Sequence, residues 1–308
     1  MSQMVHDSIA DQITDDTGLN TRRKLTQEFW FFLFRMAVVI NGLALFIIVG
    51  YMVYYGLPAI SWDFLTGLPT EGGLAGGILP CIMGTFYLSM GSMLLALPMG
   101  VASAIYLHEY ARPGLFMRIV RLAINNLAGV PSVVFGLFGM AFFVASRDLG
   151  GLGMGVSIAA GSLTLAVLIL PVIIGTSEEA LRSVPDTYRE ASLGLGATKW
   201  QTIVRVVLPA ALPGVLTGSI LSISRAAGET AAIMFTAAAS YNPRLAGSIF
   251  DEVMALPYQI YSLSVSSTDP ERTLPLQYGT SLVLITLVLG MNLIAIVLRS
   301  KLRKRLTK

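Results

Sequence analysis

The stretch Glu178–Pro209, EEALRSVPDTYREASLGLGATKWQTIVRVVLP, is a charged segment that separates two long apolar runs. Pro185 and Asp186 favour the first turn of a helix, because proline there lacks only an N–H that would be unpaired and aspartate suits the positive helix end. Gly196 suits the left-handed conformation that closes a helix, and Thr198 suits the N-cap of the next one. The stretch therefore predicts two short helices joined by a turn.

Each predicted short helix has an apolar face on one side and charged or amide side chains on the other. Such a pair can lie along a membrane surface and present its polar side to a partner in the water. We interpret the hairpin as a docking site for another protein; the alternative is an interfacial hairpin without a partner. The apolar faces consist of Tyr188, Ala191 and Leu195, then Trp200, Ile203 and Val207, and the polar residues are Arg189, Glu190, Lys199 and Gln201.

The composition places the chain in a membrane. Of its 308 residues, 54% are hydrophobic and 13% are charged, whereas soluble domains carry about 25% charged residues. The single cysteine, Cys81, excludes an internal disulfide and a multi-cysteine metal site. The two histidines, His6 and His108, are far apart in sequence, and we expect no metal site.

Six apolar segments are each long enough for the roughly 20 residues that cross a hydrocarbon core. Their continuous apolar character favours helices over a barrel, whose strands would alternate at every second residue. The sequence thus predicts an all-α membrane protein with six transmembrane helices and one large cytoplasmic loop. The predicted spans are Phe29–Tyr55, Ile78–Leu107, Arg118–Ala145, Val156–Leu181, Leu208–Ser240 and Tyr278–Arg299.

The distribution of positive residues predicts the orientation. With the N-terminus in the cytoplasm, 17 of the 21 Lys and Arg residues lie on the inner side, and only Arg147, Arg244 and Arg272 lie outside. Both termini and the docking hairpin are then cytoplasmic, as expected for a multi-pass membrane protein. The net charge of +3 therefore reflects the positive residues that set the membrane orientation, and it does not indicate nucleic-acid binding.

The chain divides by composition into three parts. Residues 1–28 form a polar, cytoplasmic N-terminal tail that we expect to be mobile and solvated. Residues 29–300 form the transmembrane domain, with the docking loop at about 178–209, and residues 301–308 form a basic cytoplasmic tail. The start does not read as a cleaved signal peptide, because the apolar run that follows is too long.

Arg225 and Glu229 are charged residues of the predicted fifth span, where placing a charge in the membrane costs free energy. They are four residues apart, and so would share one face of a continuous helix. A charge at the bilayer centre costs about 2.5–3.5 kcal/mol on insertion scales, so such residues usually face a bundle interior or a water-lined path. The alternative is a buried ion pair that only fixes helix packing.

The docking loop resembles that of the membrane subunits of ATP-binding-cassette importers. Their pattern is E-A-A, three residues, G, nine residues, I, one residue, L-P, and Glu190-Ala191-Ser192, Gly196, Val206 and Leu208-Pro209 match it with two mild departures. The resemblance implies the type I importer fold. It also implies that Glu190, Ala191, Ser192 and Gly196 contact a separate ATPase subunit.

Two further motifs resemble the permease subunits of the bacterial phosphate-specific (Pst) system. RAAGETA at Arg225–Ala231 matches their fifth span, although Ala232 replaces an expected proline, and NLAGVPSVVFG at Asn126–Gly136 matches their third. LPYQIY at Leu256–Tyr261 resembles one of the two permeases more than its sister. The resemblance implies a phosphate translocation path that is lined by Arg225, Glu229, Thr230, Asn126 and Ser132. For Asn126–Gly136 alone, close packing is favoured over substrate contact.

The resemblance implies a location in a bacterial plasma (inner) membrane, and it also implies several partners. These partners are a dimer of ATPase subunits, a second homologous permease, an extracytoplasmic phosphate-binding protein, phosphate and membrane lipid. This chain lacks the G-x-x-x-x-G-K-[ST] loop that cradles ATP phosphates. We therefore expect it to be no enzyme and to bind no cofactor, with ATP and Mg used by the partner ATPase.

Other functions stay open at this stage. The chain could be the sister permease, or could import another oxyanion such as sulfate, molybdate or phosphonate. A secondary anion transporter could also use an intramembrane Arg/Glu pair, although we find no internal repeat between the two halves, which many such carriers show. A membrane-embedded assembly or signalling scaffold is the remaining class.

Overall fold

The computed structural model describes residues 2–238, 241–266 and 270–306. The chain forms two compact units, Met1–Tyr54 and Tyr55–Lys308. The first unit consists of most of one long helix, α1 (Ser2–Gly56). This helix begins at Ser2, and no proline interrupts it before Pro58. The expected mobility of residues 1–28 stays a prediction. The cytoplasmic location of residues 1–28 and of residues 301–308 stays a prediction.

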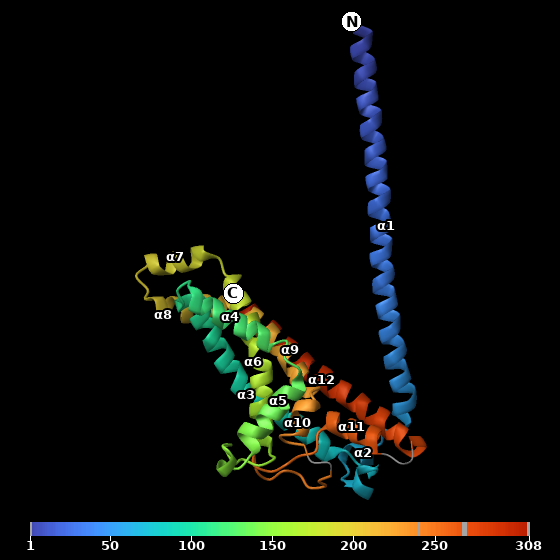
Figure 1. The fold of residues 1–308 in the computed structure, drawn as a ribbon, viewed down its shortest axis with the longest axis vertical. Coiled ribbons are helices and arrows are strands. Elements are labelled where there is room, and N and C mark those ends of the chain that lie inside the picture. Colours follow the sequence, from blue (N-terminus) through green and yellow to red (C-terminus); the bar gives the residue numbers. More distant parts are fainter. Residues whose placement is uncertain (1, 239–240, 267–269, 307–308) are drawn as a thin grey trace. The chain divides into compact units, whose positions relative to one another are not determined.

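The second unit is almost entirely helical, and Figure 1 shows α7 and α8 at one end of this unit, with α2 and α11 near the other. A two-stranded antiparallel hairpin, β1 (Pro69–Thr70) and β2 (Ala75–Gly76), is the one described sheet. The α-helices are α2 (Trp62–Thr66), α3 (Leu79–Ile105), α4 (Leu115–Leu127), α5 (Ser132–Gly139), α6 (Ile158–Arg182), α7 (Asp186–Gly194), α8 (Lys199–Thr202), α9 (Leu208–Ala227), α10 (Ala231–Met234), α11 (Leu256–Ser266) and α12 (Pro270–Leu306). Three π-helical turns extend them, at Tyr106–Tyr110, Met140–Val144 and Ile203–Val207.

The described residues contain five helices that are long and apolar enough to cross a membrane, or six if a bent pair counts as one span. This agrees with the predicted all-α membrane protein of six spans. Single helices account for five predicted spans, at Thr26–Ala59, Leu79–Tyr110, Ile158–Arg182, Lys199–Ala227 and Thr273–Lys301.

The third predicted span is not one helix. Its two parts, α4 and α5 with its π-turn, are bent by 101° at the four residues between Leu127 and Ser132. Pro131 has no N–H to continue the helical ladder, and proline also disfavours the helical conformation in the residue before it. The third span is therefore a bent pair of helices, and the predicted single span Arg118–Ala145 does not form as one continuous helix.

The fifth predicted span also differs from the expectation of Leu208–Ser240. The helix begins earlier, since α8 continues through the π-turn into α9, and it ends at Ala227 with Gly228 as its C-cap. Glycine has a low helix propensity, and a separate short helix, α10, follows. The predicted end, Ser240, lies outside the described residues.

The core of the second unit forms where α3, α6 and α9 pack together. One buried cluster contains Leu88 of α3, Leu165 and Ile169 of α6, and Ala226 of α9. Small residues bring these backbones close, which is the usual packing device of membrane helices. Gly84 of α3 lies close to another segment, the residues just before α11, because a Cβ atom at Gly84 would overlap the backbone carbonyl oxygen of Met254.

Gly84→Ala is therefore expected to destabilise the protein by about 1–3 kcal/mol, the usual cost of overpacking a core. Thermal unfolding in detergent measures this as a lower midpoint. Gly175→Ala is the matched control, because it lies inside α6 with no atom within 4 Å of the added Cβ. An unchanged midpoint for Gly84→Ala would show that the backbone shifts easily at this position.

Candidate functional site

The predicted hairpin forms, and its turn has the chemistry expected from the sequence. Asp186 begins α7 directly after Pro185, and Gly196 has a φ of 82°, the left-handed conformation. The Thr198 hydroxyl accepts from the Gln201 N–H, while the Gln201 side chain accepts from the Thr198 N–H. This reciprocal capping box fixes the start of α8. These predictions are confirmed.

The second arm of the hairpin is not a separate helix, which corrects the prediction of two short helices. α8 is a single turn that runs on into the membrane helix, so Ile203 and Val207 are buried in the bundle while Trp200 is 60% exposed. On α7, by contrast, the predicted apolar face is open, with Tyr188 53% and Leu195 90% exposed. The hairpin thus presents large apolar side chains from both arms.

The four docking residues predicted from the loop pattern lie together on the first arm and the turn. Glu190 and Ala191 are exposed on α7, and Gly196 has open space around its Cα. Ser192 is half-buried, and its hydroxyl lies 2.9 Å from the Thr202 hydroxyl of the second arm. Three of these residues are therefore available to a partner, while the fourth holds the two arms together.

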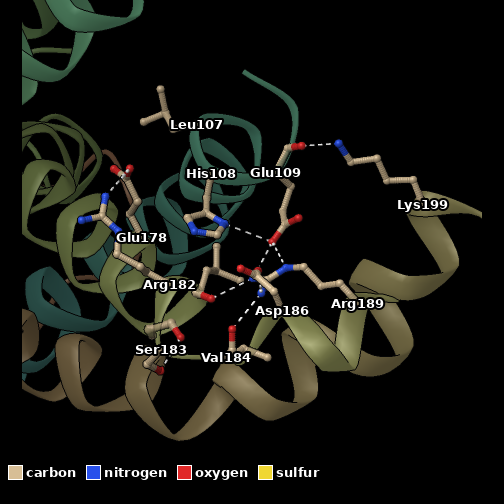
Figure 2. Close-up of polar contacts among 12 residues, drawn as sticks. Leu107, His108, Glu109, Glu178, Arg182, Ser183, Val184, Asp186, Arg189 and Lys199 are labelled. Carbon is tan, nitrogen blue, oxygen red and sulfur yellow. Dashed lines mark hydrogen bonds and ion pairs between the residues drawn. The ribbon is translucent and has the colours of Figure 1, made fainter. Parts of the chain in front are cut away.

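A buried ion pair that the sequence did not reveal anchors the hairpin to the end of α3. Arg189 of α7 donates from Nε and Nη2 to Oε1 of Glu109, at 3.2 and 2.9 Å, and the two side chains are only 14% and 8% exposed. Figure 2 shows the two side chains pointing toward each other, with His108 Nδ1 3.1 Å from the same carboxylate oxygen. The only sequence signal was a pair of polar residues, His108-Glu109, at the end of an apolar span.

A second polar cluster joins α4 to α6. The Arg121 Nη2 atom lies 2.9 Å from Oε1 of Glu178 in a close charge contact, and it donates to the Leu107 carbonyl at 3.1 Å. Arg182 adds a looser contact to Glu178 at 3.6 Å. In the described ranges, no three His, Cys, Asp or Glu side chains gather in a way that could hold a metal ion.

Arg225 and Glu229 do not share one face of a continuous helix, and the alternative of a buried ion pair between them is not formed. Arg225 lies in the last turn of α9, where the negative end of the helix dipole favours a cation, and it is exposed in the isolated chain. Glu229 follows the C-cap and lines a small interior gap with Thr85 and Pro257. Among the described residues, no ion pair involves Arg225, because the helix ends before Glu229 could share its face.

The two broken spans pack against each other through α5 and α10. α5 packs against α10, since a Cβ atom on Gly136 would lie 2.9 Å from the Ala231 carbonyl oxygen. Thr230 precedes α10, and Ser132 begins α5; both are half-buried, whereas Asn126 is exposed near the end of α4. The fold thus brings the middle of α5 against the start of α10, and leaves Asn126 on the other side of the bend.

Comparison with known proteins identifies the family. The model of the binding-protein-dependent transport system inner membrane component matches residues 96–308. The chain belongs to this family. It is therefore a multi-pass membrane component of a transport system, and the ABC permease relatives are transport components rather than enzymes.

Two curated relatives illustrate the similarity. The chain is 39% identical over 244 residues to the phosphate transport system permease protein PstA of Mycobacterium leprae, which covers 78% of this chain and 76% of the relative. It is 32% identical over 296 residues to the probable ABC transporter permease protein YqgI of Bacillus subtilis, covering 92% and 99%.

Solved structures show the same fold at low sequence identity. A bacterial alginate ABC transporter in complex with its pentasaccharide-bound periplasmic protein matches with a TM-score of 0.60 and 15% identity, over 88% of this chain and 94% of the other. The MetNI methionine ABC transporter matches with a TM-score of 0.53 and 21% identity, over 73% and 94%. These likenesses bear on the fold alone.

Proposed function

We propose that this chain is a membrane permease subunit of an ATP-driven importer of inorganic phosphate. The observation that carries the proposal is the similarity to proteins named as phosphate transport system permeases, at 39% identity in Mycobacterium leprae and 33% in Haemophilus influenzae. The motifs at Arg225–Ala231 and Asn126–Gly136 support the same substrate.

The energetics of phosphate entry require an external energy source. Moving an anion into a negative cytoplasm costs about 2.3 kcal/mol per charge per 100 mV, or roughly 4.6 kcal/mol for a dianion, before any concentration gradient. This chain has no phosphate-cradling nucleotide loop. ATP and Mg are therefore used by separate ATPase subunits.

The hairpin of α7 and α8 is the docking surface for the ATPase. Its exposed apolar residues, Tyr188, Leu195 and Trp200, would be covered in a complex, and Glu190 lies among them. Exposed apolar patches with polar rims are typical of protein interfaces. The excess of positive residues on this side of the spans supports a cytoplasmic hairpin and cytoplasmic termini.

The translocation path includes Arg225 and lies between this chain and a second, homologous permease. Arg225 is exposed when the chain is alone, so a second subunit can enclose it without unfolding this one. The guanidinium would supply charge-assisted hydrogen bonds to phosphate. Thr230 and Ser132 offer uncharged donors, and the outer residues 241–277 are the expected contact for an extracytoplasmic phosphate-binding protein.

The mechanism is alternating access. ATP closes the ATPase dimer, which moves the docking hairpins of both permeases and shifts the fifth spans, so that Arg225 faces first outward and then inward. Glu229, which lines a small interior gap, forms no ion pair with Arg225 and so does not neutralise it in this arrangement. It would have to move to do so.

Deleting the chain is expected to abolish uptake of radiolabelled phosphate in cells without another high-affinity phosphate importer, and a plasmid copy should restore it. Excess unlabelled sulfate or molybdate should not compete, because the path is proposed to be specific for phosphate. Competition by either anion would favour an importer of another oxyanion. Uptake that continued after ATP depletion would favour a secondary transporter.

A further inference from the structure

Both arms of the docking hairpin are bound to the same short segment at the end of α3. From the first arm, Arg189 reaches the Glu109 carboxylate. From the second arm, Lys199 Nζ donates to the Glu109 backbone carbonyl and lies 4.8 Å from the centre of the Tyr110 ring. Figure 2 shows Arg189 and Lys199 approaching Glu109 from different directions. The hairpin is therefore clamped to Glu109-Tyr110 as well as joined to α6 and α9 through the chain.

The guanidinium of Arg189 is the centre of this clamp. Besides Glu109, it donates to the carbonyls of Val184 at 2.7 Å and Leu181 at 2.9 Å, and to Asp186 at 3.0 Å. Leu181 lies in the last turn of α6 and Val184 directly follows its C-cap, Ser183, so one side chain connects α3, α6 and α7. A planar fork with several N–H donors fixes direction as well as distance, which a lysine could not do.

The segment that the clamp holds belongs to a helix that runs through the bundle. α3 packs in the central cluster with α6, and near its other end the Thr85 hydroxyl accepts from the Leu256 N–H at 2.8 Å. The π-turn Tyr106–Tyr110 continues α3 directly to the clamp. A displacement of the hairpin would therefore be transmitted along α3 to the start of α11, 171 residues from Thr85 in sequence.

We propose that Glu109 is a positioning residue for transport: the buried Glu109–Arg189 pair transmits movement of the docking hairpin to α3. The proposal rests on the proposed function, because it assigns a second mechanical connection to the same hairpin. Without the pair, the hairpin remains tied to α6 and α9 by the chain itself, and to the end of α3 only through Lys199. The ATPase then still docks and hydrolyses ATP, but much less of its movement reaches α3.

The test uses the complete transporter reconstituted in vesicles, with inorganic phosphate as the transported probe. Glu109→Gln keeps the side-chain shape and removes the charge. We expect the phosphate moved per ATP hydrolysed to fall about tenfold, within the range by which coupling mutations act. ATPase recovery with the complex and its hydrolysis rate should stay within about twofold of the parent, since the docking face is untouched.

Two further variants make the result specific. Glu28→Gln removes an exposed carboxylate outside the clamp, and should leave the ratio of phosphate to ATP unchanged. Arg189→Lys keeps the charge but loses the fork, and should lower the ratio as Glu109→Gln does. The Glu109→Gln/Arg189→Lys double variant should lower the ratio of phosphate to ATP no further than either single variant, because both substitutions remove the same connection.

Several outcomes would overturn the proposal. An unchanged ratio in Glu109→Gln shows that the pair does not transmit movement. If assembled complex, ATP hydrolysis and transport fall in proportion, the pair supports the fold only. The same conclusion follows if neither Glu109→Gln nor Arg189→Lys assembles. Absence of ATP-dependent phosphate transport in the parent protein would contradict the proposed function instead, so the two failures are distinguishable.

Discussion

Replacing Arg225 with glutamine is expected to reduce phosphate uptake about 100-fold, because a charge-assisted hydrogen bond to an anion contributes up to about 3 kcal/mol. Arg225 is exposed in the last turn of α9, and none of the described residues forms an ion pair with it. Glutamine retains hydrogen-bonding capacity but has no charge to stabilise phosphate. The measurement is the initial rate of radiolabelled phosphate uptake, with the amount of membrane-inserted protein determined in parallel.

The matched control for this prediction is Arg112→Gln. Arg112 is an exposed arginine at the start of the segment between α3 and α4, away from the proposed path. Its replacement should leave uptake unchanged. Near-normal uptake in Arg225→Gln, with the protein present at its usual level, would refute the role of Arg225 in the path.

Reversing the charge of Glu190 is expected to detach the ATPase. Glu190 lies exposed on α7, among apolar side chains that a docked partner would cover. A lysine in its place would be desolvated and left without its partner, which typically costs about 2–5 kcal/mol when one member of a hydrogen-bonded charge pair is lost at an interface. ATPase recovered by affinity purification of the Glu190→Lys variant should therefore fall at least about tenfold, and transport should fall with it.

Glu28→Lys serves as the control for this reversal, since Glu28 is exposed on α1 and belongs to no part of the hairpin. It should recover the ATPase normally. If the Glu190→Lys complex also kept its ATPase and its transport rate, the assignment of α7 as a docking surface would be wrong. Loss of transport with full ATPase recovery would place Glu190 in coupling rather than in attachment.

Some features of this protein follow from interactions between residues that are close together in the sequence. The turn of the hairpin is determined locally: Gly196 takes the left-handed conformation, and the capping box of Thr198 and Gln201 forms within three residues. The span limits follow from continuous apolar segments, which need no knowledge of neighbours. Both features could be predicted because the interactions that cause them lie close together in the chain.

The breaks in the third and fifth spans were missed for a different reason. The signals were present, as Pro131 in one span and Gly228 in the other. Proline and glycine can kink a membrane helix or end it, and the outcome depends on whether neighbouring helices satisfy the freed backbone groups. Here α5 and α10 pack against each other at Gly136, and this contact between distant segments favours two broken helices.

By itself, the sequence determined the membrane class, the approximate spans and the position and turn of the docking hairpin, because composition and local propensity decide these. Only the tertiary structure decided that Arg225 and Glu229 are apart and that Glu109 binds Arg189. The members of that pair are 80 residues apart, and Glu109 stands near several other charged residues that could have been its partner. Which charges meet is fixed by how α3, α6 and α7 pack, since ion pairing acts through space and leaves no periodic pattern in the chain.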